Sequence, residues 1–296
     1  MSSNDLAVDC HLHAHWPQRY DYLHPTGSRV DPSNTAASAA GLFPTLKDNG
    51  ITHCLLIQPG AYAFDNRAML DVIAASKGAV KAIGALPLDA PDEDFVELKS
   101  RGIIGIRLSL ITLDPHLFEN EKMHAFLQRC RKHDYWVEVF AAAATWPSII
   151  PLLVRSEAKV IAEHVGWPLL EEGIHQPGFQ ALLQFGRSSQ AVVKLSGGFR
   201  ISWTESYDDV RPYALELANA FGADRCIWGS DWPFLNPDVG PTKRPMKVST
   251  NYRRELGSLQ SWVQDAATRR KILWENPSRF FGFKDAIKIR DLQVTF

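Results

Sequence analysis

Val8-Asp9-Cys10-His11-Leu12-His13-Ala14-His15 lies almost at the N-terminus, and the rest of the chain is organised around it. Its apolar first half predicts a β-strand that ends in histidines spaced two residues apart. Side chains two apart on a strand point to the same face, so we expect His11 and His13 to converge on one site. The pair alone fits exposed surface residues or hydrogen-bonded core residues as well as an active site, so the function of the pair depends on the rest of the sequence.

The composition is typical of a globular protein with a small-molecule partner. The chain has 296 residues, a length that an α/β barrel occupies as one domain. Hydrophobic residues make up 45%, charged residues 22%, and the formal net charge of -1 leaves no basic surface for nucleic acid or an acidic membrane. We find no signal peptide and no run of about 18 apolar residues, so we expect a cytoplasmic protein without a membrane span. A homo-oligomer is compatible with this composition.

The four cysteines show no metal-binding spacing. Cys10, Cys54 and Cys226 fall in predicted strands, whereas Cys130 falls in a predicted helix, and no two of them form a CxxC pair. We expect four reduced, structural thiols, which agrees with a cytoplasmic location.

Strand-like and helix-like segments alternate along the chain. Each short run rich in β-branched and aromatic residues is followed by a few turn residues and then by an amphipathic stretch. Residues 16–32 predict a long loop. In the helix predicted after this loop, Pro44 indicates a kink or a later start. The predicted strands are the run ending at the histidines and residues 51–58, 80–86, 103–110, 136–140, 160–164, 191–196 and 225–229; the predicted helices are 35–49, 66–77, 91–101, 120–133, 146–156, 177–186, 207–221 and 252–266.

Eight consecutive strand–helix units predict a closed (β/α)8 TIM barrel of the α/β class. No GxGxxG follows the first strand, which argues against an open dinucleotide-binding sheet. Residues 269–283 predict a terminal helix that breaks near Pro277. We therefore expect residues 1–296 to form a single barrel domain, with residues 284–296 as a peripheral extension.

Ionisable side chains stand at the ends of five predicted strands. In a (β/α)8 barrel the active site lies at the carboxyl ends of the strands. Each of these residues alone fits a structural role, but burying several ionisable groups at one end of a barrel is costly unless a site needs them. They are His11 and His13 after the first strand, Arg107 in the fourth, His164 after the sixth, Arg200 after the seventh and Asp231 after the eighth.

These positions resemble the amidohydrolase superfamily, and more narrowly its metal-independent lactonases, the branch of 2-pyrone-4,6-dicarboxylate lactonase. The first-strand His-x-His and the final aspartate mark the superfamily, whereas the Asp-Asn-Arg-Ala-Met and Lys-Leu-Ser segments are particular to the lactonases. The resemblance covers nearly the whole chain in order. Its matching segments are residues 9–13, 65–69, 105–107, 163–166, 194–196, 228–233 and 276–277.

The fourth and fifth strands argue against a binuclear metal site. Residues 135–141 contain no histidine, and the fourth strand supplies Arg107, which cannot lose its proton to become a ligand. A single zinc on His11, His13 and Asp231 stays open as an alternative, because three protein ligands with an open position suit catalytic zinc. The resemblance implies that no metal cofactor is used.

The resemblance also implies the roles of the candidate residues. Asp231 is expected to take a proton from the attacking water. His11, His13 and His164 are expected to donate hydrogen bonds to the lactone carbonyl as negative charge develops on it. Arg107 and Arg200 match family arginines that hold substrate carboxylates.

The chain departs from the family type where the substrate binds. A second family arginine falls near Thr112 or Leu113, and Trp167 follows the Glu-His-Val-Gly segment. By the resemblance, Phe140 and Val30 stand where the family has tyrosines. Losing bidentate carboxylate contacts predicts a substrate with one carboxylate at most and a flat, apolar body lying against Phe140 and Trp167.

Two other readings stay open. The first is a zinc-dependent decarboxylase or sugar lactonase on the same barrel, which bound metal would reveal. The second is a catalytically silent barrel that binds a ligand. A base accompanied by three histidines argues against the second, so we expect a lactonase whose substrate is a small carboxylic acid derived from aromatic catabolism.

Overall fold

The centre of the molecule is a sheet of eight parallel strands in sequential order. The structure is a computed structural model that describes residues 5–24, 27–111, 115–235, 248–294 and 296. Each strand pairs with the next one along the chain, as eight consecutive strand–helix units predict. The strands are β1 Val8–Leu12, β2 His53–Ile57, β3 Val80–Gly84, β4 Ile103–Ser109, β5 Trp136–Phe140, β6 Lys159–Ala162, β7 Val192–Lys194 and β8 Cys226–Ile227.

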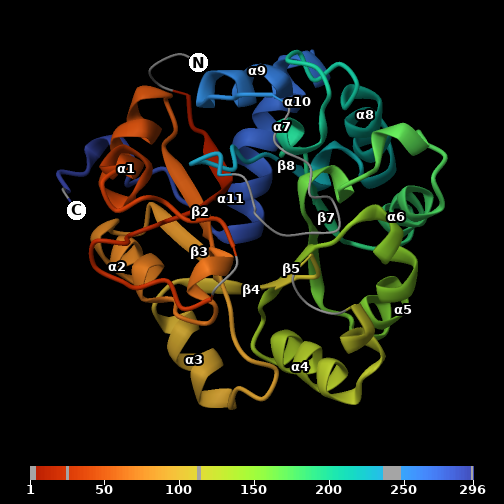
Figure 1. Ribbon diagram of the computed structural model, residues 1–296, viewed down its shortest axis with the longest axis horizontal. Helices are drawn as coiled ribbons and strands as arrows, with labels where there is room; N and C mark the ends of the chain where they lie inside the picture. The colour runs from red at the N-terminus through yellow and green to blue at the C-terminus, as the bar shows by residue number, and fades with distance from the viewer. Residues whose placement is uncertain (1–4, 25–26, 112–114, 236–247, 295) are drawn as a thin grey trace.

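The α-helices lie around the strands, so the predicted (β/α)8 barrel is confirmed (Figure 1). Each of the first six strands is followed by one of the helices α1 to α6, and the short α7 separates β7 from α8. The helices are α1 Ala39–Asp48, α2 Arg67–Ala75, α3 Asp92–Ser100, α4 Glu121–Lys132, α5 Trp146–Ser156, α6 Pro177–Ser188, α7 Gly198–Ile201, α8 Arg211–Phe221, α9 Tyr252–Trp262, α10 Ala266–Arg270 and α11 Asn276–Phe281.

The barrel closes between β1 and the segment that follows β8. The backbone nitrogen of Cys10 donates to the Trp228 carbonyl at 2.9 Å, and the nitrogen of His13 donates to the Trp232 carbonyl at 2.9 Å. Gly229 lies at this seam, where an added Cβ would come within 2.3 Å of the His11 Cβ. A glycine at this position therefore lets the segment after β8 approach β1 closely enough to close the barrel.

Two apolar clusters stabilise the barrel. The larger cluster joins outward-facing strand residues to the surrounding helices. The smaller cluster fills the barrel interior, because it takes alternate strand residues such as Leu55 and Ile57 and is covered at one end by Phe281 and Phe283. The histidines of the candidate site lie at the other end of the interior.

Some element boundaries differ from those predicted. The first helix starts later, at Ala39, and contains Pro44. Residues 207–221 form a helix only from Arg211, because Tyr207 has a left-handed backbone with φ of 56°. The predicted break near Pro277 is wrong: a π-helical turn at residues 271–275 leads into α11, and Pro277 occupies its first turn.

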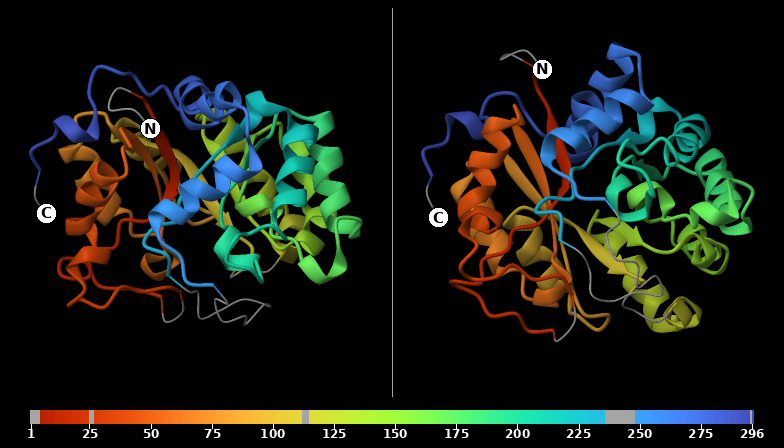
Figure 2. Two further views of the ribbon diagram at one scale, coloured as in Figure 1. Left: turned by 90° about the horizontal axis from the view of Figure 1, so that it is seen from above. Right: turned by 45° about the horizontal axis from the view of Figure 1, so that its top comes forward.

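The C-terminal segment lies against the outside of the barrel near α1 (Figure 2). The backbone nitrogen of Ile289 donates to the Thr52 carbonyl at 2.8 Å, and Lys47 Nζ donates to the Leu292 carbonyl at 2.7 Å. The four cysteines are buried free thiols, as predicted. Across the described ranges, none of the helices has both the length and the apolar character required to cross a bilayer.

Candidate active site

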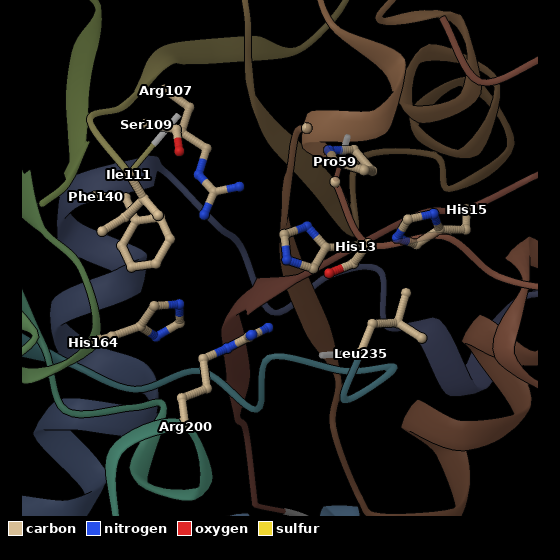
Figure 3. Close-up of a pocket in the computed structure, with 13 residues that line it drawn as sticks. His13, His15, Pro59, Arg107, Ser109, Ile111, Phe140, His164, Arg200 and Leu235 are labelled. Atoms are coloured by element: carbon tan, nitrogen blue, oxygen red, sulfur yellow. The ribbon is translucent and has the colours of Figure 1, made fainter. Parts of the chain in front are cut away.

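The candidate residues meet at the carboxyl end of the barrel. His13, Arg107, His164 and Arg200 point into one cavity, and His15 lies beyond His13 along the same wall (Figure 3). His13 and His15 both follow β1. The other three residues each come from the end of a different strand or from the loop after it. The rest of the wall is formed by Gly27, Ser28, Pro59, Gly60, Ser109, Ile111, Phe140 and Leu235.

Asp231 is fully buried among the histidines. Its Oδ1 lies 3.4 Å from His13 Nε2 and 3.9 Å from His11 Nε2. Its Oδ2 lies 3.7 Å from His164 Nε2. The structure therefore brings together all four residues that were predicted to be catalytic.

Arg200 also pairs with this carboxylate. Its Nη2 donates to Asp231 Oδ1 at 2.9 Å, and its Nε donates to Oδ2. Burial alone would raise the pKa of Asp231, but Arg200 and then His164 hold that pKa well below its usual range. Asp231 is therefore an ionised carboxylate whose basicity is restrained while Arg200 stays in place.

Arg107 is engaged by Glu163. Its Nε and Nη2 each donate to a Glu163 oxygen at 2.8 Å, and its Nη1 donates to the Gln58 carbonyl at 3.2 Å. Burial raises the pKa of Glu163, but Arg107 outweighs this effect and lowers it to about 2. Both arginines that were predicted to hold substrate carboxylates therefore already have a carboxylate partner within the protein.

The His11 ring faces the barrel interior. The register of β1 shifts between Asp9 and Leu12, and His11 Nδ1 lies 3.1 Å from Lys194 Nζ and 3.5 Å from Glu138 Oε1. Lys194 Nζ donates to Glu138 Oε2 at 2.6 Å. Burial first, and then the charge of Lys194, lower the pKa of His11 well below its usual value. The ring is therefore neutral near pH 7.

His13 and His164 have different hydrogen-bond partners. His13 Nδ1 lies 2.9 Å from the Ile57 carbonyl, which can only accept, so this nitrogen carries a proton. His164 Nδ1 lies 3.0 Å from Ser196 Oγ, while its Nε2 faces carboxylate oxygens of Glu163 at 3.5 Å and of Asp231. Burial lowers the pKa of His164 to about 4, so it is neutral near pH 7.

Left-handed backbone conformations hold the site residues in place. His164 has a φ of 45°, and Asp231 has a φ of 63°. Non-glycine residues rarely adopt this conformation, and it recurs at active sites. Gly197 packs against His164, and a Cβ on it would lie 2.6 Å from the His164 Nδ1. The loops after β6, β7 and β8 are thus shaped to place these side chains.

Two groups of described residues have ligand atoms close enough to hold a metal ion: His11 with His164 and Asp231, and His11 with Glu138 and Glu163. The first differs from the predicted zinc set because His164 replaces His13. Each group, however, already has cationic donors: Lys194 contacts His11 at 3.1 Å, and Arg200 contacts Asp231 at 2.9 Å. Positive charge at the ligand atoms disfavours a divalent cation, so the residues do not fit a metal well.

The predicted substrate-binding aromatics have different positions. Phe140 lines the cavity beneath the Arg107 guanidinium, whose Cζ lies 5.3 Å from the ring centroid. Trp167 packs behind it, with ring centroids 4.8 Å apart, and is not among the described residues that line the cavity. Val30 is buried, and Thr112 and Leu113 lie outside the described residues.

Sequence reasoning gave no role to Glu138, Glu163, Lys194 and His15. Glu138 and Lys194 are both fully buried within strands, and a charged residue in an otherwise apolar strand is the signal that could have identified them. His15 continues the alternation of His11 and His13. Its Nδ1 lies 3.0 Å from the Tyr22 hydroxyl, which itself accepts from the Val30 nitrogen at 2.9 Å.

The chain is similar to known hydrolases over most of its length. A family described as amidohydrolase matches residues 8–283. The 4-sulfomuconolactone hydrolase of Rhizobium radiobacter is 27% identical over 286 residues, covering 93% of this chain and 90% of that protein. The 2-pyrone-4,6-dicarboxylate hydrolase of Comamonas testosteroni is 26% identical over 249 residues, covering 79% and 80%. A solved structure of a probable 2-pyrone-4,6-dicarboxylic acid hydrolase from Acinetobacter baumannii, with citric acid bound, is 26% identical, has a TM-score of 0.80, and covers 94% of this chain and 99% of its own.

Proposed function

The chain belongs to the amidohydrolase family, and from that premise we propose that it is a lactonase, a hydrolase that opens a cyclic ester to the corresponding acid. The observation that carries the proposal is the position of Asp231, an ionised carboxylate with three imidazoles within 3.9 Å, buried beside the cavity that His13 and His164 line. This arrangement offers a base and hydrogen-bond donors to one reacting carbonyl.

Asp231 acts as the base that activates water. The water oxygen bonds to the lactone carbonyl carbon while one of its protons passes to Asp231, and the carbonyl π electrons move to the carbonyl oxygen. When the tetrahedral intermediate collapses, the bond between the carbonyl carbon and the ring oxygen breaks. The ring oxygen then takes the proton from Asp231, which yields a hydroxy acid or its keto form.

His11 and His164 polarise the carbonyl. The His164 Nε2 faces two carboxylates, which favours a proton on that nitrogen and makes it a donor toward the cavity. His13 differs, because its proton lies on the Nδ1 that bonds to Ile57. The His13 Nε2 lies 3.4 Å from Asp231 Oδ1, so it is placed to contact the attacking water beside that carboxylate.

Substrate binding to Arg200 would free Asp231 from its ion pair with that arginine. A carboxylate on the substrate competes with Asp231 for the guanidinium, and its binding would raise the basicity of Asp231 at the moment when a base is needed. Arg107 is held from two sides by Glu163 and Gln58 and is less free to move. A substrate with one carboxylate therefore suits the site better than a dicarboxylate.

The cavity wall supports a flat substrate. Its apolar lining includes Phe140, Ile111, Leu235 and Pro59, and the cations among the described lining residues are Arg107 and Arg200. We infer a small aromatic-derived lactone, because the relatives are named for a sulfomuconolactone and a pyrone dicarboxylate. His15, at the far end of this wall, offers a polar contact to a neutral group of the substrate.

The reaction we propose uses no metal cofactor. Cationic donors on His11, Asp231 and Glu163 support this proposal. Elemental analysis of the purified protein, with assays before and after exhaustive chelation, tests it. Stoichiometric zinc or manganese, together with activity that chelation removes, would instead support the decarboxylase or sugar-lactonase alternative.

The direct test is a panel of purified lactones followed by ultraviolet absorbance. Coumalate, a flat pyrone with one carboxylate, should be opened faster than 2-pyrone-4,6-dicarboxylate, while dihydrocoumarin represents neutral lactones. Hydrolysis of none of these, nor of aldonolactones, would favour a silent binding barrel. The buried free thiols also support our inference of a cytoplasmic location, which cell fractionation tests.

A further inference from the structure

Lys194 is a fully buried lysine at the centre of the barrel that the proposed reaction does not use. It ends β7, on the interior face of the sheet. Its Nζ lies 2.6 Å from Glu138 Oε2 and 3.1 Å from His11 Nδ1, and these three side chains have no solvent exposure. Burying an ammonium group is costly unless its partners are well placed, so its presence beside His11 calls for a function.

The contact with His11 has a direction. A lysine ammonium has three protons to donate and no lone pair, so His11 Nδ1 must supply the lone pair in this bond. In a neutral imidazole the proton then lies on Nε2. We propose that Lys194 is a positioning residue that holds His11 in the Nε2–H form, so that the ring presents a donor to the substrate carbonyl.

The Nε2 atom of His11 supports this assignment. It is buried, it has no hydrogen-bond partner among the described residues, and it lies 3.9 Å from Asp231 Oδ1. A buried donor without a partner costs free energy, and such atoms in active sites mark where a substrate atom binds. A lactone carbonyl oxygen would satisfy this donor beside the Asp231 that activates the water.

His13 provides the contrast within the same motif. Its Nδ1 bonds to the Ile57 carbonyl, an acceptor, whereas the Nδ1 of His11 bonds to a donor. The neighbours therefore give the two histidines opposite roles at Nδ1: a donor on His13 and an acceptor on His11. Similar spacing in the sequence conceals this difference, which arises from Lys194 across the barrel.

Removing the lysine should change which nitrogen of His11 carries the proton. Without Lys194, the remaining neighbour of His11 Nδ1 is Glu138 Oε1, which lies 3.5 Å away and has no other partner among the described residues. The tautomer of His11 would then no longer be fixed, because a Glu138 carboxyl oxygen can accept a proton from Nδ1, and in that form Nε2 aims a lone pair at the carbonyl oxygen. Two lone pairs would then face each other, and the donor would be lost.

The experiment measures the tautomer directly. In full-length protein labelled with 15N at histidine, long-range 1H–15N correlation should show His11 as the Nε2–H form. Lys194→Met should introduce the Nδ1–H form of His11 and leave the His13 signals unchanged. The same variant should lower kcat for coumalate by about 100- to 1,000-fold, the usual effect of losing one such donor, with a smaller change in KM.

Glu138→Gln is the matched variant if Lys194→Met fails to fold. It weakens the ion pair but keeps the lysine, so His11 should stay in the Nε2–H form. A purely structural role for the pair predicts equal losses in both variants and no change of tautomer. Native His11 in the Nδ1–H form, or Lys194→Met with only the Nε2–H form, would overturn the inference.

The mechanistic part of this inference rests on the proposed lactonase function, and the two can fail separately. If no lactone is hydrolysed while the tautomers are as described, the function is wrong and the role of Lys194 in setting the polarity of His11 stands. If coumalate is hydrolysed but the tautomers differ, only the role of Lys194 is wrong.

Discussion

Asp231→Asn separates the chemical step from substrate binding. Asparagine has nearly the same shape, and its side-chain oxygen can still accept from Arg200, which donates to Oδ1 at 2.9 Å in the native protein. The variant loses the negative charge and the ability to take a proton. Removing a general base costs about 100- to 10,000-fold in rate, which corresponds to about 2.7–5.4 kcal/mol in the activation barrier.

Substrate binding should respond in the opposite direction. Arg200 loses its ionic partner, and its side chain is 9% exposed at the cavity wall, where a substrate carboxylate can reach it. The KM for coumalate should therefore stay the same or fall while kcat falls. Dihydrocoumarin, which has no carboxylate, should show the kcat loss without any gain in binding.

Steady-state kinetics with both lactones, beside circular dichroism of the folded variant, measure this difference. Asp71→Asn is the control, since Asp71 pairs with Arg19 at 3.2 Å and does not line the cavity. It should retain native kcat and KM. A kcat for Asp231→Asn within tenfold of the native value would refute the assignment of Asp231 as the base.

Five further experiments test other parts of the site. Arg200→Gln should lower kcat/KM for coumalate by about 10- to 100-fold, because charge-assisted hydrogen bonds are lost, while dihydrocoumarin changes less; equal losses with both lactones would contradict a role in carboxylate binding. The kcat/KM for coumalate should fall as the pH drops through about 4, where His164 protonates; an unchanged value below that pH would contradict a role for the neutral ring. The free energy of unfolding in urea should fall between about pH 6.5 and 4, because the unfolded chain binds a proton on this histidine near 6.5 while folded His164 does not until about 4. Gly197→Ala should reduce kcat by about tenfold or more, since a Cβ 2.6 Å from His164 Nδ1 displaces that ring and a φ of 71° disfavours alanine; native kcat would show that the loop absorbs the change. His15→Phe should raise KM by about 2- to 10-fold with little effect on kcat, as expected for the loss of one neutral hydrogen bond, and a fall in kcat alone would contradict a binding role.

The barrel was predictable because the pattern that specifies it is local. Buried residues recur with one spacing in strands and another in helices, and this alternation along the sequence predicted all eight strands in order. The ends of elements were less predictable, because tertiary contacts decide them. Tyr207, for example, was assigned to a helix, but its hydroxyl bonds to Glu255 on α9 at 2.8 Å and its backbone turns away.

The sequence predicted which residues form the site but not which of their side chains contact one another. His11, His13, His164 and Asp231 meet as expected because the carboxyl ends of parallel strands lie at one end of a barrel. Their polarity could not be predicted, since it depends on atoms distant in the sequence. Lys194 lies 183 residues from the histidine that it contacts.

The pairing of the two cavity arginines also bears on how the substrate arrives. Arg107 and Arg200 are each neutralised by a carboxylate a few ångströms away, and the whole chain has a formal net charge of -1. From a distance, the mouth therefore presents little uncompensated positive field to draw in an anion. The substrate should therefore arrive by diffusion without long-range attraction, and its carboxylate should replace Asp231 at Arg200 only after it has entered the cavity. The kcat/KM for coumalate should then vary little with ionic strength.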